Sequence, residues 1–161
     1  MKISYNSKMR IFLNKKLANI ENINEPLPSA LYNLLSRGIE CIDDCVYLKA
    51  NISFLRKIDK NDLFDKTGLE CFVNKITLDE YVSNEATIDE IFETGVSALN
   101  FLKTLLYNES GKFLIIFGIQ HDNDFLSGTL RFHKYRPGES WLSDNLEGYE
   151  ESILVVHINK R

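Results

Sequence analysis

The feature that most constrains the fold of this 161-residue chain is a long amphipathic helix predicted over residues 88–108. Thr87 and Glu90 have the spacing of a capping box, in which the glutamate side chain reaches back to the threonine N–H. Asp89 and Glu90 also place negative charge at the positive end of the helix dipole. We expect Gly111 to end the helix. One broad apolar face is formed at three- and four-residue steps by Ile88, Ile91, Phe92, Leu99, Leu102, Leu105 and Leu106.

After this helix the hydrophobic period changes from near four to two. Residues 113–117 are a continuous apolar run, as expected for a strand covered on both faces. The sequence His-Asp-Asn-Asp at 121–124 is typical of a turn. Residues 129–135 then alternate between apolar and polar side chains, and 153–156 form a last apolar run. The second half therefore predicts a long helix followed by a three-stranded antiparallel meander.

The first half carries weaker patterns. We expect strands over residues 9–13 and 69–78, and a helix that opens at Pro28-Ser29 and stops at Gly38. Residues 51–58 fit a helix or a strand equally well. The length suits one ordinary domain and is too short for two. The sequence thus predicts a single α+β domain over residues 1–161, with helices packed on a mostly antiparallel sheet.

Charge and hydropathy limit the classes of function that the sequence allows. Lys and Arg total 19 against 23 Asp and Glu, a formal charge of −4, which argues against direct binding of nucleic acid and favours a basic protein partner. No apolar stretch approaches the roughly 20 residues that cross a bilayer, and none follows Met1. We therefore expect a cytoplasmic protein without a membrane partner. Cys41, Cys45 and Cys71 are expected to be reduced, buried thiols, and no metal or cofactor signature is present.

One set of side chains raises the possibility of an enzyme. Arg131 and His133 share a face of the predicted strand, and Glu139 follows closely. Such a set could perform general acid–base chemistry on a phosphodiester, as in a small hydrolase or nuclease. We favour the alternative that these residues belong to the wet face of an antiparallel sheet.

The turn at Asp122 and Asp124 resembles the start of a calcium-binding loop. Counted from Asp122, however, the fifth and twelfth positions hold Leu126 and His133 rather than acids. No metal site is expected there.

The segment from Pro137 to Glu151 is unusual because it holds five acids, no Lys or Arg, and the only tryptophan, Trp141. Aromatic anchors among acids suit a surface that binds a basic protein. The alternative is a connection in which Trp141 and Leu142 pack on the sheet. The acids can remain solvated, and so available to a partner, in either case.

The segment Leu130–Tyr149 resembles one found in bacterial immunity proteins that accompany polymorphic toxins, notably those of contact-dependent growth inhibition. The preceding helix and strand, Thr87–Ile119, fit the same resemblance, which covers the C-terminal half of the chain. It implies a cytoplasmic protein, not an enzyme, that binds the C-terminal toxin domain of its cognate effector. Such toxins are often nucleases, and acidic side chains would occlude the basic active-site cleft.

Three acidic segments are candidates for this interface: residues 139–151 first, the turn at 122–124 second, and the Asp43-Asp44 pair third. A module that binds some other basic peptide or protein would show the same acidic surface without any link to toxin survival. The candidate toxin-binding residues are Glu139, Trp141, Asp144, Glu147, Tyr149, Glu150, Glu151, Asp122, Asp124, Asp43 and Asp44.

Overall fold

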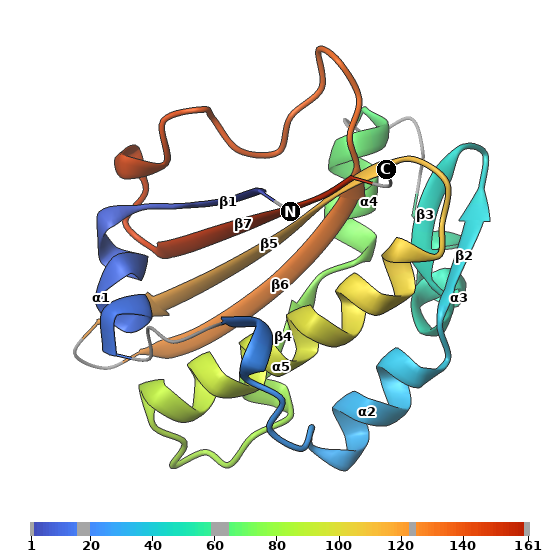
Figure 1. Cartoon of the computed structure of the whole chain (residues 1–161). Helices are drawn as coiled ribbons and strands as arrows, with labels where there is room; N and C mark the ends of the chain where they lie inside the picture. The colour runs from blue at the N-terminus through green and yellow to red at the C-terminus, as the bar shows by residue number, and fades with distance from the viewer. Residues whose placement is uncertain (1, 16–19, 59–64, 123–124, 160–161) are drawn as a thin grey trace.

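A five-stranded antiparallel sheet with the strand order β1-β7-β5-β6-β4 forms the centre of the computed structural model, which describes residues 2–15, 20–58, 65–122 and 125–159 (Figure 1). Its strands are β1 (Lys2–Tyr5), β4 (Ile76–Thr77), β5 (Lys112–His121), β6 (Leu126–Lys134) and β7 (Ser152–Asn159). A second sheet pairs β2 (Ile39–Ile42) with β3 (Cys45–Leu48). The helices are α1 (Ser7–Lys15), α2 (Ser29–Ser36), α3 (Ile52–Leu55), α4 (Lys66–Val73) and α5 (Ile88–Tyr107). The predicted α+β class is confirmed.

The predicted long helix is confirmed as α5. Thr87 Oγ1 accepts a hydrogen bond from the Glu90 N–H at 3.3 Å, and Glu90 Oε2 accepts one from the Thr87 N–H at 2.6 Å, which completes the capping box. Asn108 closes the helix, and Gly111 follows with a φ of 127°. This left-handed backbone suits glycine and turns the chain into β5.

The main core lies between α5 and one face of the large sheet. Phe92 of α5 contacts Phe117 of β5 and also stacks on Phe12 of α1, with ring centroids 6.2 and 5.6 Å apart. Gly95 lets the helix approach closely, since a Cβ at this position would lie 2.2 Å from the Phe117 ring. The apolar face predicted for residues 88–108 therefore packs on one side of the sheet and forms the main core there.

The last three strands are antiparallel, as predicted, but β7 lies beside β5 rather than β6. Phe117 pairs with Leu130 of β6 on one side and with Leu154 of β7 on the other. The chain between β6 and β7 must therefore cross β5. Residues 135–151, here called the strap, make this crossing over the sheet face opposite α5 (Figure 1).

Two strand predictions in the first half are wrong. Residues 9–13 belong to α1, which Asn6 caps by accepting the Met9 N–H at 3.0 Å. Residues 69–73 belong to α4, which Asp65 caps by accepting the Gly68 N–H at 2.7 Å. The helix α4 is only eight residues long, so its apolar residues span about two turns and are easily mistaken for a strand. Only 76–77 of the second predicted strand form β4.

The other elements of the first half follow the sequence more closely. The helix α2 begins at Ser29 after Pro28, and Gly38 follows it with a φ of 80°. The ambiguous residues 51–58 contain α3. Cys45 and Cys71 are buried free thiols, as expected, whereas Cys41 is exposed. No helix of the described chain is long and apolar enough to span a membrane.

Candidate functional site

The face of the sheet beneath the strap carries the polar residues that the sequence singled out. His133 on β6 pairs in register with Leu114 on β5, which pairs in turn with His157 on β7. Register partners on neighbouring strands point to the same side, so the two imidazoles flank Leu114. His133 is only 3% exposed. The expectation of a wet face is therefore wrong at His133, because the strap covers this part of the sheet.

Helix N-termini hold two of the strap's acids. Glu139 Oε2 accepts the Thr67 N–H of α4 at 3.0 Å, and both carboxylate oxygens of Glu147 accept the Ser7 N–H of α1, at 2.9 and 3.1 Å. Unpaired N–H groups and the helix dipole favour a carboxylate at these positions. Glu139 and Glu147 thus fasten the strap to two helices.

A buried asparagine fastens the end of the strap. Asn6 Nδ2 donates to the backbone oxygens of Leu146 and Glu151, at 3.3 and 2.7 Å, while its Oδ1 accepts the Ile153 N–H at 3.1 Å. Since this side chain also caps α1, it joins the first helix to the last strand.

Two of the strap's three aromatic residues, Trp141 and Tyr149, pack inward, whereas Tyr135 is exposed. Trp141, Leu142 and Tyr149 contact an apolar cluster on the sheet that includes Ile116 and Val155. Packing of Trp141 and Leu142 on the sheet, the alternative considered for them, is confirmed.

The guanidinium of Arg131 lies over the Trp141 ring, 5.0 Å from its centroid, and its Nη1 donates to the Cys71 oxygen at 2.8 Å. Burial lowers the pKa of Arg131, although Cys71 and Glu151 oppose this shift.

The other acidic candidates differ in their surroundings. Asp144, Glu150 and Glu151 on the strap are exposed. Asp122 is exposed at the end of β5, where its N–H donates to the Phe125 oxygen at 2.9 Å, and Asp124 lies outside the described residues.

Asp43 and Asp44 form the β2–β3 turn with φ values of 52° and 65°. Asp44 pairs with Lys134 and with Lys66, and the Lys134 hydrogen bond lowers its pKa. These basic neighbours offset the charge of Asp44, so Asp43-Asp44 is the least available of the three acidic candidates.

The proposed catalytic set is divided between two cavities. His133 and Glu139 line one of about 390 Å³, and Arg131 lines another of about 310 Å³. Trp141 and Leu142 line both cavities and form the wall between them. Because Arg131 and Glu139 are also bonded to backbone groups of α4, the three side chains do not converge on one reacting atom.

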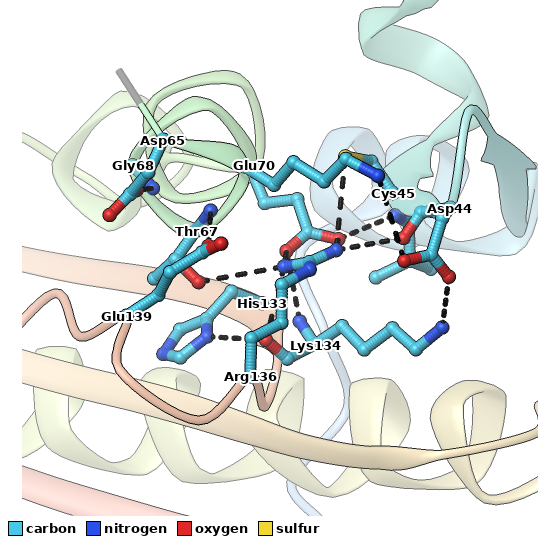
Figure 2. Close-up of polar contacts among 12 residues, drawn as sticks. Asp44, Cys45, Asp65, Thr67, Gly68, Glu70, His133, Lys134, Arg136 and Glu139 are labelled. Atoms are coloured by element: carbon cyan, nitrogen blue, oxygen red, sulfur yellow. Dashed lines mark hydrogen bonds and ion pairs between the residues drawn. The ribbon is translucent and has the colours of Figure 1, made fainter.

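The densest polar cluster surrounds Glu70 of α4, a residue that the sequence did not single out. Glu70 is fully buried, and its two oxygens accept the Val46 and Lys134 N–H groups at 2.6 and 3.0 Å (Figure 2). Arg136 adds two hydrogen bonds, from Nη1 at 2.6 Å and from Nη2 at 3.2 Å. Burial lowers the pKa of Arg136, but the hydrogen bond and charge of Glu70 more than offset it, so the pKa is raised.

Asn74, one helical turn beyond Glu70, continues this junction. Its Oδ1 accepts the Leu48 N–H at 3.0 Å, and its Nδ2 donates to the oxygens of Val46 and Phe132, at 2.8 and 3.1 Å. The side chains of Glu70 on α4 and of Asn74, its C-cap, thus bond to both β3 and β6. With every acceptor of Glu70 engaged, this cluster joins the two sheets rather than offering a reactive group.

A second acidic region also escaped the sequence analysis. Residues 76–102 contain six acids and no Lys or Arg, a charge run that could have been counted directly. Most of these acids lie around the N-terminal end of α5, on the side of the sheet opposite the strap. They are Asp79, Glu80, Glu85, Asp89, Glu90 and Glu93.

Comparison with known proteins defines the family. The model of the Uncharacterized protein PM0498 family matches residues 4–161, and the chain belongs to this family. It is similar to the uncharacterized protein PM0498 of Pasteurella multocida (strain Pm70), with 30% identity over 167 residues, covering 98% of this chain and 99% of that protein. No solved structure matches the chain.

Proposed function

We propose that this chain is an immunity protein that binds the C-terminal toxin domain of a cognate contact-dependent growth inhibition effector. In this proposal it acts in the cytoplasm, and its acids occlude the basic active-site cleft of a nuclease toxin. The observation that carries the proposal is the fastened strap, which holds Asp144, Glu150 and Glu151 at the surface. A surface whose backbone is already fixed loses less entropy when it binds.

Binding fits the geometry better than catalysis. Arg131 is separated from His133 and Glu139 by Trp141 and Leu142, which line the cavities on both sides. Within the described residues, no group of three or more His, Cys, Asp or Glu side chains is placed to hold a metal ion. A hydrolase built on Arg131, His133 and Glu139 would need these groups around one substrate.

The test is coexpression with the C-terminal domain encoded by the neighbouring upstream reading frame. We expect this domain to arrest growth alone, the present chain to restore growth, and the two to copurify as a stable complex. A toxic domain that this chain neither binds nor neutralises would contradict the proposal.

Two triple variants of equal charge change test the strap. Asp144→Asn/Glu150→Gln/Glu151→Gln should weaken binding by about tenfold or more, since charge pairs across an interface contribute to its stability. The matched control Glu40→Gln/Glu80→Gln/Glu85→Gln removes three exposed acids elsewhere and should bind as the wild type does. Equal loss in both variants would show that net charge, rather than the strap, drives binding.

A further inference from the structure

The larger cavity beneath the strap has the form of a binding site for a small molecule. Its volume is about 390 Å³, within the range of ordinary ligand sites. Apolar side chains line part of it, namely Leu114, Ile116, Trp141, Leu142, Leu146 and Val155. The polar side chains around it include His133 and His157, on either side of Leu114. A cleft that combines apolar side chains with convergent polar groups is typical of sites that bind small organic ligands.

His133 supplies an unused hydrogen-bond acceptor. Its Nδ1 lies 3.0 Å from the Lys134 carbonyl oxygen, which can only accept, so Nδ1 carries the proton and Nε2 holds a lone pair. In the described part of the chain Nε2 has no hydrogen-bond partner. Figure 2 shows the ring directed away from the Glu70–Arg136 pair. An acceptor that has no partner within the protein is free to accept a hydrogen bond from a ligand.

The charges around the cavity favour an uncharged ligand. Burial lowers the pKa of His133 despite its bond to Lys134 and the charge of Glu70, and burial lowers that of His157 together with the charge of Lys2. Both rings are therefore neutral near pH 7. The carboxylates of Glu139 and Asp144 line the cavity and oppose an anion, and Lys2, which also lines it, opposes a cation.

We propose that this cavity binds a small uncharged molecule with an apolar ring and one hydrogen-bond donor, of the phenol class, which donates to Nε2 of His133. The apolar ring would lie between Leu114 and the wall formed by Trp141 and Leu142. The cavity shares Asp144 with the proposed toxin interface, whereas Glu150 and Glu151 lie outside its lining.

The test titrates ¹⁵N-histidine-labelled protein with p-cresol and, in parallel, with toluene, which has the same ring and no donor. We expect saturable binding of p-cresol, a shift of the His133 Nε2 resonance, and a change in Trp141 fluorescence. Toluene should bind at least about fivefold more weakly, since one net hydrogen bond contributes roughly that factor. Equal binding of the two probes, or the absence of saturation, would overturn the proposal.

A variant distinguishes the hydrogen bond from shape alone. His133→Phe keeps a ring in place and should bind p-cresol and toluene equally, whereas the exposed-site control His121→Phe should keep the wild-type preference. If His133→Phe fails to fold, wild-type protein is titrated instead at a pH low enough for its ¹⁵N resonances to show His133 protonated. The preference for p-cresol should then be lost, and a preference that persists with a protonated His133 would contradict the assigned acceptor.

Discussion

At the residue scale, Glu70 is a buried carboxylate that accepts hydrogen bonds from β3, β6 and the strap. Its partner Arg136 lies 66 positions away, so no local pattern could reveal the pair. The Glu70–Asn74 spacing would have been visible only if α4 had been recognised as a helix. Residues that act through such distant contacts escape prediction from the sequence, whereas the Thr87–Glu90 capping box, which is local, was predicted.

Glu70→Gln should therefore destabilise the fold strongly. It removes the charge opposite the half-buried Arg136 and one acceptor, and breaking a buried pair costs about 3–5 kcal/mol. Urea unfolding measures this loss. The control Asp44→Asn breaks an exposed pair at a positive φ that asparagine tolerates, so its effect should be much smaller. Equal effects of the two variants would contradict the junction assigned to Glu70.

The buried imidazole of His133 should make stability depend on pH. Its pKa in the folded chain lies below the ordinary value of 6.5, mainly because of burial. The unfolded chain therefore binds the proton more readily, and stability should be full above pH 6.5 and fall as the pH drops toward the folded-state pKa. Unfolding free energies at pH 7.5 and pH 5 should differ less in His133→Gln than in wild-type protein. An unchanged difference would assign the dependence to other groups.

At the scale of elements, a helix was predicted correctly where its apolar pattern and its cap were both clear in the sequence. The helix α5 has one buried face and a cap, so its period and start were readable. The helix α4 has only eight residues, about two turns, and this length is too short for its period to be separated from that of a strand. Asn6 and Asp65, which cap α1 and α4, were visible in the sequence and could have indicated that helices begin there.

The close contact between α5 and the sheet can be tested by substitution. Gly95→Ala should destabilise the protein by about 1–3 kcal/mol, because the added methyl would overlap the buried Phe117 ring. Gly118→Ala on β5 meets no atom within 4 Å and serves as the matched control. Thermal unfolding of both variants compares them. A tolerated Gly95→Ala would show that helix and sheet are less closely packed.

The hydrogen bonds that hold the strap on the sheet can be tested at Asn6. Asn6→Ala leaves the Glu151 and Leu146 oxygens and the Ile153 N–H without their partner. A buried group left unpaired, as the Ile153 N–H would be, costs about 1–3 kcal/mol. We expect a destabilised protein whose Trp141 emission shifts to the red, since the strap would lift from the sheet. An unshifted emission would show that apolar packing alone holds Trp141.

At the scale of the whole molecule, the structure places a fastened acidic strap on one side of the sheet and the acids near the N-terminus of α5 on the other. The formal charge of −4 could be counted from the sequence, but the separation of these two surfaces could not, because it follows from β7 pairing with β5 instead of β6. Charge of this kind speeds association with a basic partner and is screened by salt.

The most direct measurement is therefore the association rate of this chain with the toxin domain at low and high ionic strength. We expect a rate that falls by about tenfold or more as salt rises. The fall should be smaller for Asp144→Asn/Glu150→Gln/Glu151→Gln than for the control Glu40→Gln/Glu80→Gln/Glu85→Gln. A rate indifferent to salt, or equally sensitive in both variants, would contradict the role assigned to the strap.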